Sequence, residues 1–225
     1  PFAVKPQKKI SVQDVMNMLR GHMEGTPFDM AAADAWYVRD GDKMVKSPLA
    51  TPFVTKDVRN LLSVPYSRPI AKWDCAYSFV SQARSGYPAA VKTVLWFGYD
   101  NPHTTCYVPV YSGILQTKES WRTFDRKAFS LGSAQWAFIL ADDLVNHRYQ
   151  DAIKDLKAVR DPLELDFAKQ AAEVDKKALE LAKEDPAKAQ EYITKFTNDC
   201  MEKAEKAWWQ LNWDLISKYN NNQKK

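Results

Sequence analysis

Residues 67–111 read SRPIAKWDCAYSFVSQARSGYPAAVKTVLWFGYDNPHTTCYVPVY, and aromatic and β-branched side chains alternate there with small or polar ones. Such alternation is typical of strands that are covered on at least one face. It predicts four strands, at 67–73, 76–84, 91–99 and 104–111. The breaks between them fall on Gly, Pro, Asn or Asp, which tolerate positive φ or remove a ladder donor. An antiparallel meander is the simplest topology, with helices before and after it available to cover one face.

The residues before this stretch predict a short helix and a hairpin. Ser11 is placed to cap a helix with its hydroxyl, and Asp14 stands at the third helical position, as in a capping box. Further along, Asp-Gly-Asp at 40–42 reads as a turn. It is expected to join two short strands at 36–39 and 43–46.

The C-terminal part changes to a helical pattern. A long helix is expected over 133–160, and Asp161-Pro162 then predicts a new helix with an Asp cap and Pro at its first position. Asp185-Pro186 repeats that signature. Three successive helices with short breaks suggest antiparallel packing.

Length and composition fit a globular protein. The chain has 225 residues, of which 45% are hydrophobic and 27% are charged, so it can bury a core. One large domain, or one domain with a helical appendage, is expected. We predict a sheet-containing part at 1–132 and a helical segment at 133–225 that packs on it, which together define an α+β fold.

Charge and hydropathy argue against two classes of partner. The net charge is +4, but the basic residues are scattered, whereas a nucleic-acid footprint concentrates them on one face. No apolar run approaches the length of a membrane span. Because the chain begins with Pro1 and not Met, the lack of a leader pattern leaves a cytoplasmic and an exported location equally open.

Several segments, in order along the chain, resemble the C-terminal half of the dipeptidase A and secernin-like family. They are RGHMEGTPFD at 20–29, SRPIA at 67–71, YSFVSQAR at 77–84, LWFGYD at 95–100, YVPVYSG at 107–113 and SAQWAF at 133–138. The resemblance implies a bacterial cysteine hydrolase of the N-terminal-nucleophile class. Its fold would be a four-layer sandwich of helices over two antiparallel sheets, of which this chain supplies a part. The implied reaction is hydrolysis of dipeptides through an acyl-enzyme, with no cofactor and no metal.

The resemblance also implies that the attacking group lies outside this chain. Enzymes of that class use the thiol of residue 1, with its own α-amine as base. Pro1 has neither a thiol nor a hydroxyl. The nucleophilic cysteine is therefore expected from the N-terminal half of the same enzyme, as a second chain or a missing segment, and the isolated chain is expected to be inactive. A homo-oligomer is compatible with the same expectation.

Arg68 is the candidate catalytic residue, in a supporting role that the resemblance suggests. A buried arginine beside a catalytic cysteine would lower the pKa of the thiol and help to hold a substrate carboxylate or an oxyanion. The alternative is a surface or ion-paired arginine at the start of a strand.

Two rival interpretations stay open. In one, the sheet and helices form a non-enzymatic binding or structural module. In the other, Cys75 or Cys106 works with His103 as a thiol–imidazole dyad, although a free cysteine in a sheet is usually a small buried hydrophobe. The three histidines are dispersed along the chain and suggest no metal site. Asp142 and Asp143 diverge by about 100° on a helix, which favours a solvated helix face.

Overall fold

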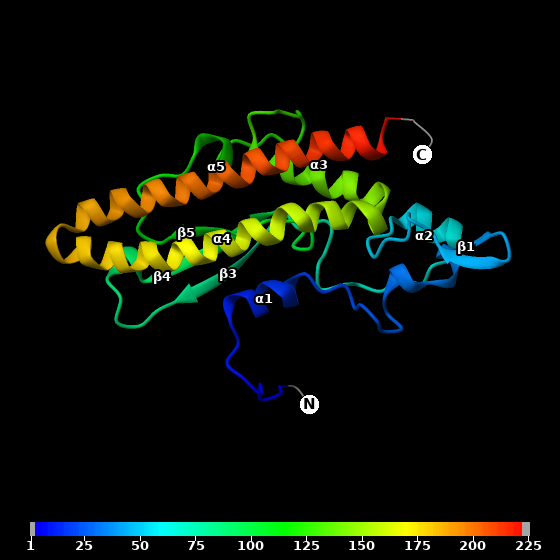
Figure 1. Cartoon of the computed structure of the whole chain (residues 1–225), viewed down its shortest axis with the longest axis horizontal. Coiled ribbons are helices and arrows are strands. Elements are labelled where there is room, and N and C mark those ends of the chain that lie inside the picture. Colours follow the sequence, from blue (N-terminus) through cyan, green and yellow to red (C-terminus); the bar gives the residue numbers. More distant parts are fainter. Residues whose placement is uncertain (1–2, 222–225) are drawn as a thin grey trace.

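The computed structural model describes residues 3–221, and within them it is an α+β protein with two small antiparallel sheets, as predicted (Figure 1). The α-helices are α1 (Val12–Leu19), α2 (Lys56–Leu62), α3 (Ala134–His147), α4 (Tyr149–Glu184) and α5 (Pro186–Tyr219). The strands are β1 (Tyr37–Asp40), β2 (Lys43–Lys46), β3 (Tyr77–Ala83), β4 (Thr93–Tyr99) and β5 (Val108–Tyr111). Short 3-10 helices lie at Met30–Ala32, Asp34–Trp36, Ala89–Val91 and Glu119–Trp121.

The larger sheet confirms the predicted meander, with β4 between β3 and β5 and both pairings antiparallel. The predicted first strand, at 67–73, is wrong. Pro69 has no N–H to donate to a ladder, and the backbone N–H of Ala71 donates instead to the carbonyl of Gly21, at 2.9 Å. This segment is therefore tied to the chain after α1 and forms no edge strand.

The other predicted N-terminal features are confirmed. The hydroxyl of Ser11 accepts from the backbone N–H of Asp14, and the Asp14 carboxylate accepts from the backbone N–H of Ser11, which completes a capping box. The turn at 40–42 joins β1 and β2 into a hairpin.

Three long helices follow the sheet, but their first break is not where the sequence placed it. The chain breaks at Arg148, and Pro162 lies inside α4. A proline inside a helix costs about 3 kcal/mol. Packing overrides that cost, because Arg160 and Glu164 on either side of Pro162 are buried and hydrogen-bonded to the segment before β5. The restart at Asp185 is confirmed, since its carboxylate accepts from the N–H of Ala187 at 2.9 Å.

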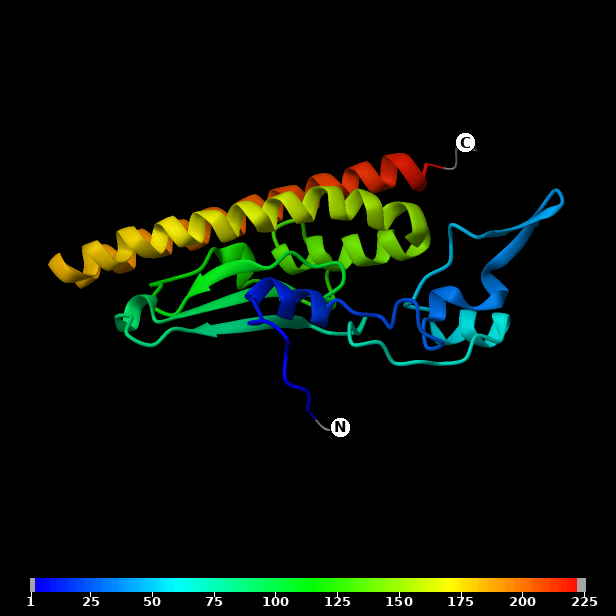
Figure 2. The same ribbon diagram turned by 60° about the horizontal axis from the view of Figure 1, so that its bottom comes forward.

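Helices α4 and α5 form an antiparallel pair that covers one face of the larger sheet, and α1 lies beside β3 (Figures 1 and 2). One core cluster joins β3, β4 and β5 to these helices and to α3. The face of the sheet that carries Tyr77 and Phe79 is covered in part, because Phe97 and Tyr99 on the same face contact Trp121, and Tyr99 also contacts Phe138 of α3. On strand β3, Tyr77 and Phe79 are 55% and 49% exposed. The Tyr77 ring stacks on Phe97 of β4 at 5.7 Å between centroids, so an aromatic surface is left open to solvent.

Residues 30–66 form a smaller unit, which we call the small lobe. It has its own core of Met30, Trp36, Ala50, Val54 and Val64, and its hairpin projects from the molecule (Figure 2). Bonds from Gln150 of α4 to the carbonyls of Pro48 and Ala50 join the lobe to the helices. Among the described helices, none combines the length and the apolarity needed to cross a membrane.

Candidate functional site

A cavity lies where the segment after α1 enters the small lobe. Its volume is about 670 Å³. It is lined by residues 26–30, 32–35 and 62–67. Residues 26–29 of the lining belong to the RGHMEGTPFD motif described above.

The lining of this cavity carries negative charge only. It includes the carboxylates of Asp29 and Asp34, and none of its residues is Lys, Arg or His. Pro27, Met30, Leu62 and Val64 supply apolar walls. Such a combination suits a ligand with a cationic group attached to an apolar one.

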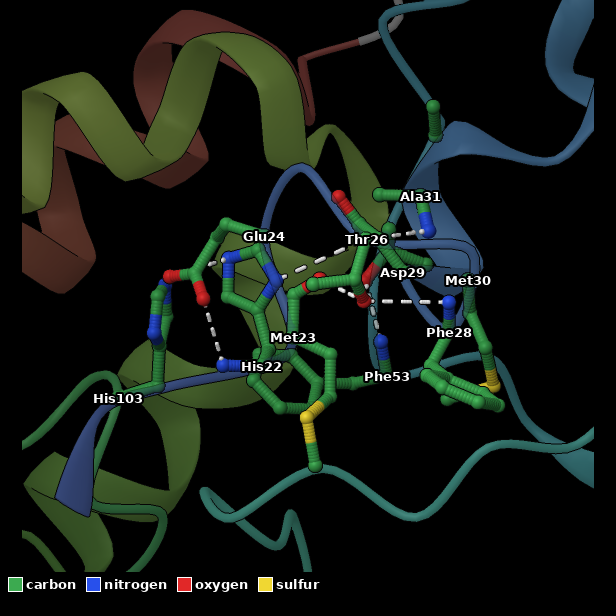
Figure 3. A network of polar contacts seen from close by, with 12 residues as sticks. His22, Met23, Glu24, Thr26, Phe28, Asp29, Met30, Ala31, Phe53 and His103 are labelled. Atoms are coloured by element: carbon green, nitrogen blue, oxygen red, sulfur yellow. Dashed lines mark hydrogen bonds and ion pairs between the residues drawn. The ribbon is translucent and has the colours of Figure 1, made fainter. Parts of the chain in front are cut away.

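His22 lies behind the cavity and holds the motif together (Figure 3). Its side chain is 9% exposed. Nε2 lies 3.1 Å from Oε1 of Glu24, and the backbone N–H of His22 donates to Oε2 of the same carboxylate. Nδ1 lies 3.6 Å from Oδ1 of Asp29. Burial lowers the pKa of His22, and the Glu24 and Asp29 carboxylates oppose that shift.

A second histidine joins the network through Tyr149, the first residue of α4. The Tyr149 hydroxyl lies 2.7 Å from Nε2 of His103 and 3.3 Å from Nε2 of His22. Nδ1 of His103 lies 2.8 Å from the carbonyl oxygen of Arg20, which only accepts, so Nδ1 carries the proton of a neutral ring. Nε2 therefore accepts from Tyr149. Burial is the main cause that lowers the pKa of His103 to about 3, which agrees with a neutral ring.

A buried ion pair lies beneath this network. Oε1 of Glu164 accepts from Nη2 of Arg20 and from the backbone N–H of Tyr107. Nη1 of Arg160 donates to the carbonyl of His103 at 2.8 Å. The contacts tie α4 to the segment after α1 and to the segment before β5, the two that carry the histidines.

The expectation of a solvated helix face for Asp142 is wrong. Asp142 is 4% exposed and accepts hydrogen bonds from Nδ2 of Asn101 and Oγ1 of Thr104. Burial raises the pKa of Asp142 to about 7, and burial together with the charge of Asp142 raises the pKa of Asp100 to about 8. The sequence held a signal for this, because Asp142 follows Phe138 by four residues and precedes Val145 by three, within one apolar stripe.

Arg68 does not occupy the buried strand position that was expected. It lies in the irregular segment between α2 and β3 and is exposed. Within residues 3–221, its guanidinium has no recorded hydrogen bond or ion pair. Its neighbour in sequence, Ser67, lines the cavity, whereas Arg68 itself is not among the lining residues. Its catalytic role stays a prediction.

The cysteines and His103 do not form a dyad. Both ring nitrogens of His103 are engaged, by Arg20 and by Tyr149. Burial is the largest cause that raises the thiol pKa of Cys75 and of Cys106, the latter well above its ordinary value. Both thiols are free of disulfides and are held in the protonated, weakly nucleophilic form. Across residues 3–221, no three His, Cys, Asp or Glu side chains are grouped to hold a metal ion.

Comparison with known proteins places this α+β chain among peptidases. The model of Peptidase family C69 matches residues 1–161, and the chain belongs to that family. The matched region contains the larger sheet, the small lobe and the His22 network, and it ends within α4. A protein named "Probable dipeptidase" from Latilactobacillus sakei is 27% identical over 136 residues. That alignment covers 60% of this chain but 23% of the relative, so the chain spans under a quarter of the relative's length.

Proposed function

We propose that this chain is the C-terminal part of a cysteine dipeptidase of the N-terminal-nucleophile class. The observation that carries the proposal is the family match over residues 1–161, which contains all residues of the cavity and of the His22 network. The name of the Latilactobacillus sakei relative supports dipeptides as substrates. In this proposal the chain supplies the substrate cavity and the sheet scaffold. A separate N-terminal segment supplies the cysteine.

The proposed reaction proceeds in two steps. The cysteine sulfur attacks the dipeptide carbonyl while its α-amine takes the thiol proton, and the proton passes to the leaving amine as the C–N bond breaks. Water then attacks the thioester, which releases the acid and regenerates the thiol. Arg68, which follows the lining residue Ser67, is the proposed contact for the substrate carboxylate, which its planar fork of donors matches.

The proposed place for the N-terminal segment is the exposed β3 side of the larger sheet. Tyr77 and Phe79 form an exposed aromatic surface there, and strand β3 is paired on one side only. Exposed apolar patches of this kind often mark interaction sites. Strands of the missing segment packed on this face would give the second sheet that the sandwich requires.

The isolated chain is expected not to hydrolyse dipeptides, and addition of the cysteine-bearing N-terminal segment is expected to give turnover. The physical reason is that the attacking thiol comes from that segment. Turnover is measured as the release of free amino acids from Leu-Gly, monitored by chromatography. Turnover by the isolated chain would contradict the proposal.

Two variants test the docking face in the same experiment. Phe79→Glu places a charge on this exposed part of the sheet and is expected to abolish co-elution with the N-terminal segment. Leu61→Glu is the matched control, because Leu61 of α2 is 82% exposed but lies away from the sheet. If both variants associate as the wild type does, the segment docks elsewhere. If the unmodified chain binds the segment without any turnover, the non-enzymatic module is the better description.

Blocking the chain's own thiols is expected to leave the activity of the assembled enzyme unchanged within about twofold. The thiols of Cys75, Cys106 and Cys200 have raised pKa values, with burial the largest cause for each, and are poor nucleophiles. A Cys75→Ser variant, compared with wild type in the dipeptide assay, tests the most accessible of them. A loss of about a hundredfold or more would instead favour a thiol enzyme based on this chain's own cysteine.

A further inference from the structure

We infer that the cavity of the small lobe binds a primary ammonium group through Asp29, and that in the enzyme this group is the free N-terminus of the peptide. The second half of this inference rests on the proposed dipeptidase function, whereas the first half does not.

Asp29 is a nine-tenths buried carboxylate with one open oxygen. Its side chain is 10% exposed. Oδ1 accepts from the backbone N–H of Ala31 at 3.0 Å, and the His22 ring faces the same oxygen (Figure 3). Oδ2 has no recorded partner among residues 3–221, although Asp29 lines the cavity. An ionised carboxylate keeps a strong demand for donors at each oxygen.

The residue behind Asp29, His22, leaves the charge of that carboxylate largely uncompensated. Nδ1 of His22 is buried without a hydrogen-bond partner in the described chain and lies 3.6 Å from Oδ1 of Asp29. Because burial lowers the pKa of His22, its ring is neutral at pH 7 and supplies no full positive charge. The carboxylate is thus held at Oδ1 by the N–H of Ala31, and no full positive charge of His22 balances it.

The rest of the cavity selects the kind of cation. Asp34 adds a second negative charge to the lining, and the lining holds no basic residue. Arg59 of the neighbouring α2 stacks on the ring of Tyr66 at 4.5 Å and is not among the lining residues. The apolar walls suit an aliphatic group beside the cation. A primary amine on an apolar chain meets both requirements, with three donors for Asp29 Oδ2 and its surroundings.

This chemistry has two sources, a peptide N-terminus and a free alkylamine, and titration calorimetry separates them. The probes are Leu-Gly, N-acetyl-Leu-Gly and isoamylamine, each titrated into the 225-residue chain. Leu-Gly and isoamylamine are expected to bind. N-acetyl-Leu-Gly, which has no ammonium group, is expected to bind at least about tenfold more weakly, since a charge-assisted hydrogen bond is lost.

Asp29→Asn is the decisive variant, because Asn keeps an oxygen to cap Ala31 and removes the charge. It is expected to weaken the binding of Leu-Gly and isoamylamine by at least about tenfold and to leave that of N-acetyl-Leu-Gly unchanged. Asp40→Asn on the exposed hairpin is the matched control and should bind as wild type. Circular dichroism checks the fold, and the ligand comparison on the wild-type chain stands even where the variant does not fold.

Each outcome decides one point. Equal binding of the acetylated and free dipeptides, no effect of Asp29→Asn, or no binding of either amine overturns the ammonium site. Binding of isoamylamine without Leu-Gly overturns the assignment to a peptide N-terminus. Binding of Leu-Gly through Asp29, without hydrolysis in the presence of the N-terminal segment, supports the site and contradicts the proposed function alone.

Discussion

Replacing Glu164 with glutamine is expected to lower the free energy of unfolding by about 3 to 5 kcal/mol, the usual cost of leaving a buried charge without its partner. Glu164 is 4% exposed and accepts from Arg20 and from the backbone N–H of Tyr107. Arg160 is also buried, and the charges of both Arg20 and Glu164 affect its pKa: Arg20 lowers it and Glu164 raises it. The neutral amide of the variant would leave two buried guanidinium groups with no buried anion between them. Urea denaturation followed by circular dichroism measures the change.

Glu173→Gln supplies the matched control on the same helix. Glu173 pairs with Lys176 at 2.9 Å, but both side chains are more than 70% exposed. Exposed pairs of this kind contribute about 0.5 kcal/mol or less. A Glu164→Gln variant that unfolds at the same urea concentration as Glu173→Gln would show that the buried pair does not stabilise this fold.

The parts of the fold that follow local rules were predictable from the sequence. Alternation in 76–111 predicted the order and direction of β3, β4 and β5, and the Asp-Gly-Asp turn placed the hairpin. Ser11 and Asp185 capped helices as expected, because a cap depends on residues within one turn. Alternation and turn chemistry depend on residues that are neighbours in sequence. They can therefore be recognised in a single amino-acid sequence.

The failures have long-range causes. Pro162 sits inside α4 because Arg160 and Glu164 bond to a segment 57 residues away in sequence. Residues 67–73 form no strand because Ala71 finds its acceptor at Gly21. Contacts between residues so far apart in sequence leave no local sequence pattern. Local propensity therefore predicted the wrong structure at both Pro162 and residues 67–73.

The candidate site shows the same limit. His22 and His103 are far apart in sequence, and from that dispersion we inferred only that they form no metal site. In the structure their rings lie 5.0 Å apart between centroids and share the hydroxyl of Tyr149. The resemblance located the motif that carries His22 and Asp29, but only the fold brings that motif to the wall of a cavity.

Asp100→Asn is expected to make the stability of this protein less dependent on pH. An Asp in an unfolded chain has a pKa near 3.9, whereas burial and the charge of Asp142 raise that of Asp100 to about 8. Between these pH values the folded state binds more protons than the unfolded state, so this group's contribution to stability falls as the pH rises. Asp142 accepts bonds from Asn101 and Thr104 that favour its ionised form, so a proton shared by the pair belongs on Asp100. Asn also tolerates the left-handed backbone at this position, where φ is 64°.

The comparison between variant and wild type, over pH 5 to 8, isolates this contribution. The lowered pKa values of His22 and His103 make the fold lose stability as the pH falls below about 6.5, a slope of opposite sign that both proteins share. The gain in the free energy of unfolding of Asp100→Asn over wild type is therefore expected to grow with pH and to be roughly 3 to 4 kcal/mol larger at pH 8 than at pH 5. Urea denaturation at each pH gives the difference, and Asp40→Asn on the exposed hairpin should track wild type throughout. If the difference in the free energy of unfolding between variant and wild type stays constant from pH 5 to 8, Asp100 is ionised in the folded protein. The proton would then have to reside on Asp142.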